Sequence, residues 1–168
     1  VNLSITTDTD EVVSTVSQWV DAINAALDGI EELTDYDPDE ETAGPLQGDM
    51  TAMRVQSRLY NLVTRRFNGI SGPYTSLRDI GITLGDDGRL SLDESRLRQV
   101  LGNGLTHVRD LFTTEDDGVG DLFYETIHGF TSSNPGLITN RVESFQQRID
   151  MLTRQKEQYQ KRVEGGLQ

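Results

Sequence analysis

His107 and His128 are the only side chains in this sequence whose ordinary pKa lies near neutral pH, and no cysteine is present. The two histidines fall on separate short helical patterns, and no carboxylate or serine is spaced around them as a catalytic motif requires. The sequence also lacks a glycine-rich phosphate loop, a nucleophile elbow and a metal-ligand helix motif. We therefore predict that the chain is not an enzyme and has no catalytic or cofactor-binding residues.

An acidic stretch at 35–47 partly matches a calcium-binding loop. Asp35, Asp37 and Asp39 have the spacing of the first three ligands of such a loop. The sixth position is Glu40, where the turn needs glycine, and the twelfth is Leu46, where the ion needs a bidentate glutamate. We expect a solvated acidic loop here, with no bound metal.

A second partial match lies at 83–94. Asp87, Gly88 and Glu94 fit three positions of the calcium loop, but its first ligand would be Thr83. Two short alternating runs surround the Asp-Gly pair, and this arrangement is typical of a β-hairpin. The hairpin is the better interpretation, so we predict no metal site in the chain.

Composition excludes several classes of partner. The net charge is −13, and binding to nucleic acid or to an anionic membrane surface requires clustered cations. No run of 18 apolar residues and no basic leader followed by an apolar run occurs, so neither membrane insertion nor an ordinary signal peptide is expected within these residues. With 168 residues and 35% hydrophobic side chains, the chain is long enough to bury one core.

Two long amphipathic patterns predict the helices that would carry the interaction surfaces of the protein. From 136 to 164, apolar residues recur at spacings of four and three, and only Lys156 interrupts the row. A second row with the same spacing runs from Val12 to Leu33. We expect the two rows to pack against each other within one chain and antiparallel, with Trp19 as the anchor because a buried tryptophan removes the most apolar area from water. The predicted helix-packing residues are Val16, Trp19, Ile23, Ile30, Val142, Phe145, Ile149 and Leu152.

The remaining patterns complete a mainly α fold, with long antiparallel coiled-coil-like helices in a bundle and a small β component. We expect 1–168 to form one helical domain of a longer protein, with a strand at 1–6 that returns from a missing outer domain. A helix pair should occupy 10–68, the hairpin and short helices 77–135, and the long heptad helix 136–164. Glycines at 102 and 104 should break a helix between 93 and 112.

Seven short motifs follow one another in the order found in a known family. They are WVDAIN at 19–24, LTDYD at 33–37, GPLQGD at 44–49, LRDIGI at 77–82, DGRLSLD at 87–93, VRDLF at 108–112 and GLI at 136–138. Together they resemble the carboxyl-terminal part of the flagellar filament-capping proteins, also called hook-associated protein 2. Each motif is weak alone, but the resemblance spans nearly the whole chain.

The resemblance implies a helical leg region of the cap that lies at the tip of the bacterial flagellum. Proteins of this family are exported by the flagellar secretion system, assemble as a ring-shaped homo-oligomer and guide the insertion of flagellin. The implied partners are other copies of the chain, flagellin, hook-filament junction proteins and an export chaperone. The implied location is extracellular, and no cofactor, nucleic acid or membrane insertion is implied.

Three other interpretations are compatible with the residues. The chain could be a helical spacer of another extracellular filament or secretion apparatus, although such helices usually lack an Asp-Gly hairpin followed by a Leu-Phe pair. It could belong to a cap module that bears an adhesin, with the host-binding surface in the missing outer domains. An intracellular coiled-coil adaptor is the third interpretation, and secretion through a flagellar system would argue against it.

Overall fold

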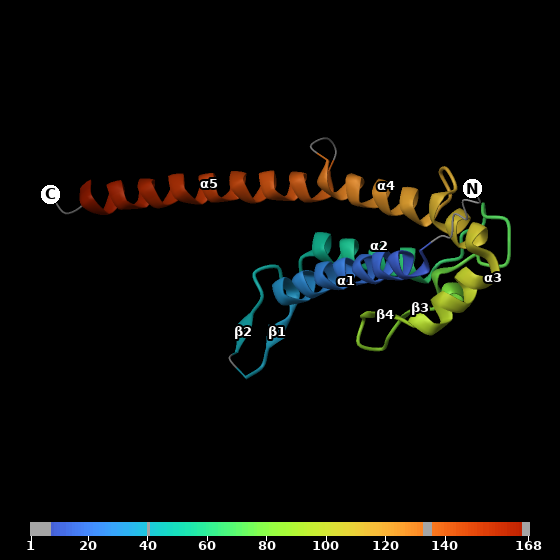
Figure 1. The fold of residues 1–168 in the computed structure, drawn as a ribbon. Coiled ribbons are helices and arrows are strands. Elements are labelled where there is room, and N and C mark those ends of the chain that lie inside the picture. The colour runs from blue at the N-terminus through green and yellow to red at the C-terminus, as the bar shows by residue number, and fades with distance from the viewer. Residues whose placement is uncertain (1–7, 40, 133–135, 166–168) are drawn as a thin grey trace. The chain divides into compact units, whose positions relative to one another are not determined.

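The computed structural model describes residues 8–39, 41–132 and 136–165, and the chain divides into two compact units, Val1–Glu125 and Thr126–Gln168. Helices dominate the described residues, and the strands form two short antiparallel pairs (Figure 1). The prediction of a mainly α fold with a small β component is therefore confirmed. The strand expected at 1–6 lies outside the described residues.

The first helix, α1 (Thr9–Thr34), begins at an aspartate cap. The Asp8 carboxylate accepts hydrogen bonds from the main-chain N–H groups of Asp10 and Glu11, which have no partner within the helix. The side chains of α1 that enter the core recur every three or four residues along the helix. They are Val13, Val16, Val20, Ile23 and Leu27. This face lies beside the heptad row read from the sequence and shares only two residues with it.

A second hairpin follows α1 where the sequence predicted a loop. Strands β1 (Tyr36–Asp37) and β2 (Thr42–Ala43) pair antiparallel, with Tyr36 opposite Ala43. The Asp37 carboxylate accepts a hydrogen bond from the N–H of Asp39 and so closes the turn. All four strand residues are exposed, so no alternation of apolar and polar residues marked them as strands. The sequence predicted a solvated acidic loop here; the strand residues are exposed, but the segment forms a short hairpin that was not predicted.

Helix α2 (Met50–Thr64) begins at the expected cap, Asp49, and buries Val55, Leu59, Leu62 and Val63. A short 3-10 helix, η1 (Leu77–Ile80), then leads to the predicted hairpin, which is confirmed as β3 (Ile82–Leu84) and β4 (Leu90–Leu92). Its turn contains Gly88 at φ +74, where an added Cβ would also lie 2.6 Å from the Tyr60 hydroxyl. The positive φ of the turn therefore favours glycine, and a side chain at this position would also displace the Tyr60 hydroxyl of α2.

Helix α3 (Glu94–Thr113) is capped by Asp93 and departs from helical geometry at Gly104, within the stretch where a break was expected. Helix α4 (Val119–Thr131) follows after a short turn. The core of the first unit forms where α1, α2 and α3 surround η1 and the β3–β4 pair, and its fully buried members include Phe67, Leu77, Ile82, Leu97 and Leu111.

Polar contacts fix where α1 lies on the β3–β4 hairpin. The Asn24 amide donates to the Leu90 carbonyl oxygen at 2.9 Å and accepts from the Leu90 N–H at 2.8 Å. Arg89, the preceding residue, forms ion pairs with Asp28 and Glu31, one and two turns further along α1. The second unit contains α5 (Leu137–Gly165), a helix of 29 residues that begins close to the expected position.

We expect Asn24→Ala to lower the free energy of unfolding by about 1–3 kcal/mol, because both main-chain groups of Leu90 lose a part-buried partner. Urea unfolding followed by Trp19 fluorescence would measure the change. Gln18→Ala on the same helix is the control, since the Gln18 amide bonds only to Ser14 on an exposed surface. Equal stabilities of the two variants would contradict this account of how α1 is attached.

Candidate functional site

The four predicted packing residues of α1 differ in burial. Val16 and Ile23 are buried, with 7% and 8% of their surface exposed, whereas Trp19 and Ile30 are half-buried. Val16 and Ile23 therefore serve the core of the first unit. Trp19 and Ile30 lie on the side of α1 next to the core face, together with the half-buried Val12. Helix α1 thus carries two adjoining apolar stripes, one inside the unit and one at its surface.

Trp19 packs against aromatic side chains that the sequence did not single out as its partners. Its ring meets Phe123 edge-on at 5.0 Å between centroids and Phe112 edge-on at 6.1 Å. Such edge-to-face pairs add to the gain from burying apolar area. Phe112 lies on α3 and Phe123 on the part of α4 that belongs to the first unit, so Trp19 contacts two further helices within that unit. These contacts are with α3 and α4, so the expectation that Trp19 anchors the packing of α1 against the last long helix stays a prediction.

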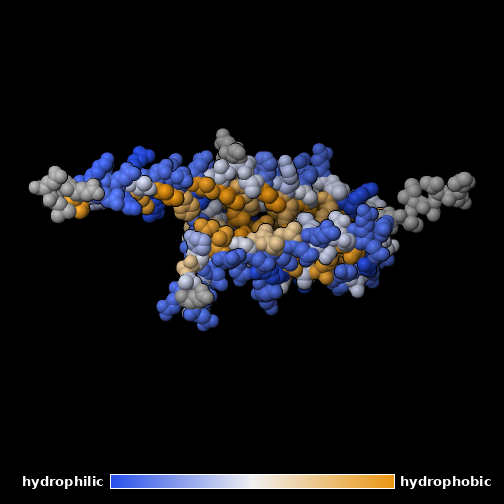
Figure 2. Space-filling view, turned by 60° about the vertical axis from the view of Figure 1, so that its left-hand side comes forward, coloured by the Kyte–Doolittle hydropathy of each residue, from blue (hydrophilic) through white to orange (hydrophobic). Residues whose placement is uncertain are grey.

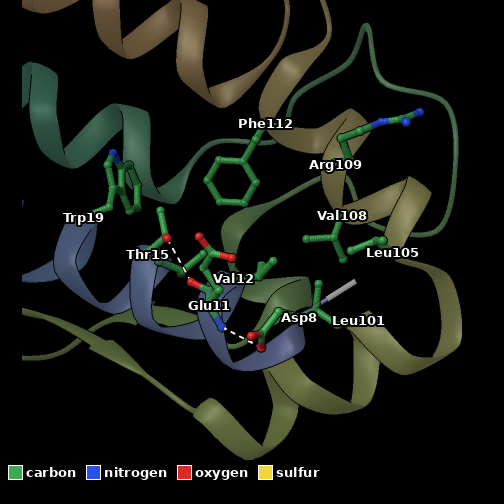
Figure 3. Close-up of a pocket in the computed structure, with 11 residues that line it drawn as sticks. Asp8, Glu11, Val12, Thr15, Trp19, Leu101, Leu105, Val108, Arg109 and Phe112 are labelled. Atoms are coloured by element: carbon green, nitrogen blue, oxygen red, sulfur yellow. Dashed lines mark hydrogen bonds between the residues drawn. The ribbon is translucent and has the colours of Figure 1, made fainter. Parts of the chain in front are cut away.

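An apolar groove of about 580 Å³ opens beside Trp19, between α1 and the second half of α3 (Figure 3). Its walls are aliphatic and aromatic, and its polar residues stand at the edges. Asp8 and Glu11 lie at the α1 side, whereas Arg109 lies at the α3 side. The apolar lining consists of Val12, Val16, Trp19, Leu101, Leu105, Val108 and Phe112. Asp8 is already used as the cap of α1, so the groove suits apolar side chains rather than chemistry.

The four predicted packing residues of α5 are all exposed. The exposed fractions are 61% for Val142, 36% for Phe145, 56% for Ile149 and 52% for Leu152. They lie in one row along the helix, which Figure 2 shows as a line of hydrophobic side chains on α5. The row continues to Tyr159 and Val163, which are 63% and 64% exposed. We call this row the α5 seam, and it has the spacing of a helix that packs against a partner helix.

The two sides of the α5 seam differ in charge. Arginines precede Val142, Ile149 and Val163, whereas neutral polar residues follow Phe145, Leu152 and Tyr159. The Arg141 guanidinium lies 4.4 Å from the centre of the Phe145 ring, and that of Arg162 lies 5.3 Å from the Tyr159 ring. With six basic and four acidic side chains, α5 carries a net charge of +2 in a chain of −13. A complementary surface would be acidic on the arginine side.

Neither histidine lies in a catalytic arrangement among the described residues. His107 is exposed and lies edge-on to Tyr74 at 6.4 Å between ring centroids, and His128 is exposed on α4. Within 8–39, 41–132 and 136–165, no group of three or more histidine, aspartate or glutamate side chains is arranged to hold a metal ion. Within these same residues, no helix is both long enough and apolar enough to cross a membrane.

These features define a helical interaction protein whose conspicuous surfaces are the groove beside Trp19 and the α5 seam. The chain belongs to the family described as flagellar hook-associated protein 2 C-terminus, which matches residues 1–166. The family resemblance carried by the seven motifs is therefore confirmed.

Several known flagellar proteins are similar to this chain. The flagellar hook-associated protein 2 of Salmonella typhimurium is 25% identical over 91% of this chain and 34% of its own length. The polar flagellar hook-associated protein 2 of Vibrio parahaemolyticus is 27% identical over 94% of this chain and 23% of its own. The crystal structure of the flagellar cap protein FliD of Escherichia coli, domains D1 to D3, gives a TM-score of 0.73 at 27% identity, covering 83% of this chain and 37% of that one. The chain spans about a third or less of these relatives.

We expect Trp19→Ala to lower the free energy of unfolding by about 2–4 kcal/mol, because it removes a large half-buried ring and both aromatic contacts. Urea unfolding followed by far-ultraviolet circular dichroism measures this without the tryptophan signal. Trp19→Phe, which keeps an aromatic ring at the site, should lose less than half as much. An alanine variant as stable as the parent would refute the anchoring role.

Proposed function

We propose that the chain is the helical part of a structural protein that caps the flagellar filament at its tip. The observation that carries the proposal is the family match over residues 1–166, supported by the similarity to the Escherichia coli cap protein. In this role the protein assembles with copies of itself and guides the polymerisation of flagellin. The work is mechanical and non-enzymatic, since it depends on contacts between surfaces rather than on bond making.

The proposed setting is extracellular, after export by the flagellar secretion system. The partners proposed are further copies of the chain in a ring, flagellin, hook-filament junction proteins and an export chaperone. Exposed apolar helix surfaces such as the α5 seam support contacts of this kind, because apolar rows of this length on a soluble helix mark places where another helix packs. The comparisons favour this role over a spacer or an adhesin module.

We further propose that the α5 seam packs antiparallel against the surface stripe of α1, which contains Val12, Trp19 and Ile30, in the same chain. The pairing expected from the sequence set Val16, Trp19, Ile23 and Ile30 against Val142, Phe145, Ile149 and Leu152. Of the four α1 residues, the half-buried Trp19 and Ile30 remain accessible to α5, whereas Val16 and Ile23 are buried in the first unit. Charge supports the proposed packing, because α1 contains six acidic residues and no basic one, whereas α5 is net basic. The antiparallel direction places Ile30 next to Val142 and Trp19 next to Leu152.

Deleting the gene in its own bacterium tests the proposed role. We expect the deletion strain to release unpolymerised flagellin into the medium and to lose swimming, because nothing retains flagellin at the growing end. The full-length gene should restore both properties, and immunoelectron microscopy should place its product at filament tips. Normal filaments and normal swimming in the deletion strain would overturn the proposal.

A double-mutant cycle tests the proposed pairing of α1 with α5. If Ile30 touches Val142, the effects of Ile30→Ala and Val142→Ala on the free energy of unfolding should differ from additivity by at least about 0.5 kcal/mol. Chemical denaturation of the full-length protein gives all four values.

The control cycle combines Ile30→Ala with Val163→Ala. Val163 lies 21 residues further along α5 than Val142, which is about 31 Å on a helix, so these effects should add. Additivity in both cycles would exclude the proposed pairing while leaving the role as a cap untouched.

A further inference from the structure

One segment of this acidic chain is strongly basic. Residues 50–78, which contain α2 and the turn that leads into η1, include five arginines and no carboxylate, a net charge of +5. The remainder of the chain therefore carries −18. The five side chains are Arg54, Arg58, Arg65, Arg66 and Arg78. Charge is therefore separated along the sequence, with a cationic segment in a chain that is anionic elsewhere, and groups of opposite charge on separate molecules attract one another.

The arginines later in the chain differ from this group in how they are paired. Arg89 binds Asp28 and Glu31, and Arg98 binds Asp10 and Glu94, so these two serve the fold. Among the described residues, no carboxylate lies within ion-pair distance of Arg66 or Arg78, both of which are exposed. No ion pair within the described residues therefore neutralises these two side chains, although the charge of Arg66 acts on the nearby Asp79.

Arg66 and Arg78 line the same hollow, at the end of α2 farthest from the β1–β2 hairpin. The hollow measures about 370 Å³ and also contains Thr64, Ser76, Asp79 and Thr83. Its one carboxylate, Asp79, already accepts hydrogen bonds from the N–H groups of Thr75 and Ser76, both at 2.9 Å. Partial burial acts to raise the pKa of Asp79, but these hydrogen bonds and the charge of Arg66 outweigh it and lower the pKa. Asp79 is therefore ionised and already hydrogen-bonded to the main chain. The guanidinium groups of Arg66 and Arg78 can then bind a carboxylate from another molecule.

The β1–β2 hairpin supplies the opposite charge. Residues 35–43 contain five carboxylates and no cation, and both strands are exposed. The hairpin extends from the end of α1, away from the helices of its own unit (Figure 1). Tyr36, with 44% of its surface exposed, adds an aromatic ring to the same projection. Carboxylates beside an exposed aromatic ring are groups that arginine binds well, by ion pairs and by stacking on the ring.

The hairpin and the hollow of one chain lie too far apart to meet. The hairpin leads into the first turn of α2 through six residues, whereas the hollow contains residues from the last turn of α2 and beyond. Helix α2 has 15 residues, so about 22 Å of rigid helix separates its two ends. A contact between hairpin and hollow must therefore join two molecules.

We propose that the acidic β1–β2 hairpin of one copy docks on the arginine-lined hollow of a second copy, around Arg66 and Arg78. This inference rests on the proposed function as a self-assembling cap. The contact joins two different surfaces, so each copy keeps one free hairpin and one free hollow for its neighbours. Repetition of such a contact closes into a ring when the rotation between copies allows it, and otherwise grows into a helical array.

Charge reversal in the full-length protein tests the contact. Arg66→Glu with Arg78→Glu makes the hollow acidic, and Asp39→Arg with Glu41→Arg changes the net charge of residues 35–43 from −5 to −1 without removing the Asp37 carboxylate that closes the turn. Either pair should raise the concentration at which half the protein assembles by at least tenfold, as measured by sedimentation velocity at low salt. The variant that carries all four changes should assemble at a lower concentration than either pair alone, because the arginines introduced on the hairpin can pair with the glutamates introduced in the hollow.

Asp21→Arg with Asp86→Arg is the matched control for the hairpin pair. Both side chains are exposed carboxylates outside the proposed contact, and the net charge changes by the same amount. This variant should assemble as the parent does. Circular dichroism must show that each variant keeps the helical content of the parent, so that the four-change variant reports contact rather than refolding.

The outcomes separate this inference from the proposed function. If the parent assembles and both reversed pairs assemble equally well, or if the four-change variant fails to recover, the hairpin contact is wrong and the cap role stands. If the hairpin control loses assembly as strongly as the hairpin pair, net charge rather than this contact governs association, and the inference also falls. If the full-length parent stays monomeric at every concentration and salt, the self-assembling cap and the contact fall together.

Discussion

The attachment of α1 to the β3–β4 hairpin is the interaction on which the first unit depends. Burial of the Val13–Leu27 face supplies the driving force, at roughly 25 cal/mol for each Å² of apolar surface removed from water. That force has no direction, so it does not decide how α1 rotates or slides on the hairpin. The two hydrogen bonds from Asn24 to Leu90 decide it, because both main-chain groups need a partner and only one position of α1 supplies it.

Fixing the rotation of α1 also determines which of its residues remain at the surface. With Val20 and Leu27 turned inward, Val12 and Trp19 turn toward α3, where the groove opens. The groove is therefore a consequence of how the core is built. The apolar surface of α1 is wider than the face that the core buries. The remaining apolar area can contact another element or molecule. The same side chain, Trp19, then packs on Phe112 and Phe123 on one side and lines the groove on the other.

Periodicity and turn chemistry predicted most of the elements. The caps Asp49 and Asp93, the Asp-Gly hairpin, the break near Gly104 and the long last helix all lie where their local signals place them. These signals act within a few residues, so the sequence alone reveals them. The β1–β2 pair was missed because its residues are polar and exposed on both strands, which leaves no alternation to read.

The face that α1 buries was also harder to read than its helical character. A heptad row through Val12, Trp19 and Ala26 and a core row through Val13, Val20 and Leu27 differ by one residue, and both are apolar. Choosing between them requires the position of the hairpin, 66 residues away, to which Asn24 bonds. The aromatic partners of Trp19 and the grouping of Arg66 with Arg78 depend on distant contacts in the same way. Such groupings arise from tertiary structure and leave no local signal.

Helix α5 presents the opposite situation to α1. Its 29 residues are enough for a helix, but the side chains of the seam from Val142 to Val163 remain 36–64% exposed, so the seam gains little from burial. An isolated helix in water is marginal, because propagation adds little free energy per residue and most helical stability in proteins comes from packing an apolar face. The seam is uniform in spacing except at Lys156, and a charged residue at such a position selects among partners and registers at a cost in stability. The order of α5 should therefore be coupled to the contact that covers its seam, so that the same surface determines both the stability of the helix and its place in an assembly.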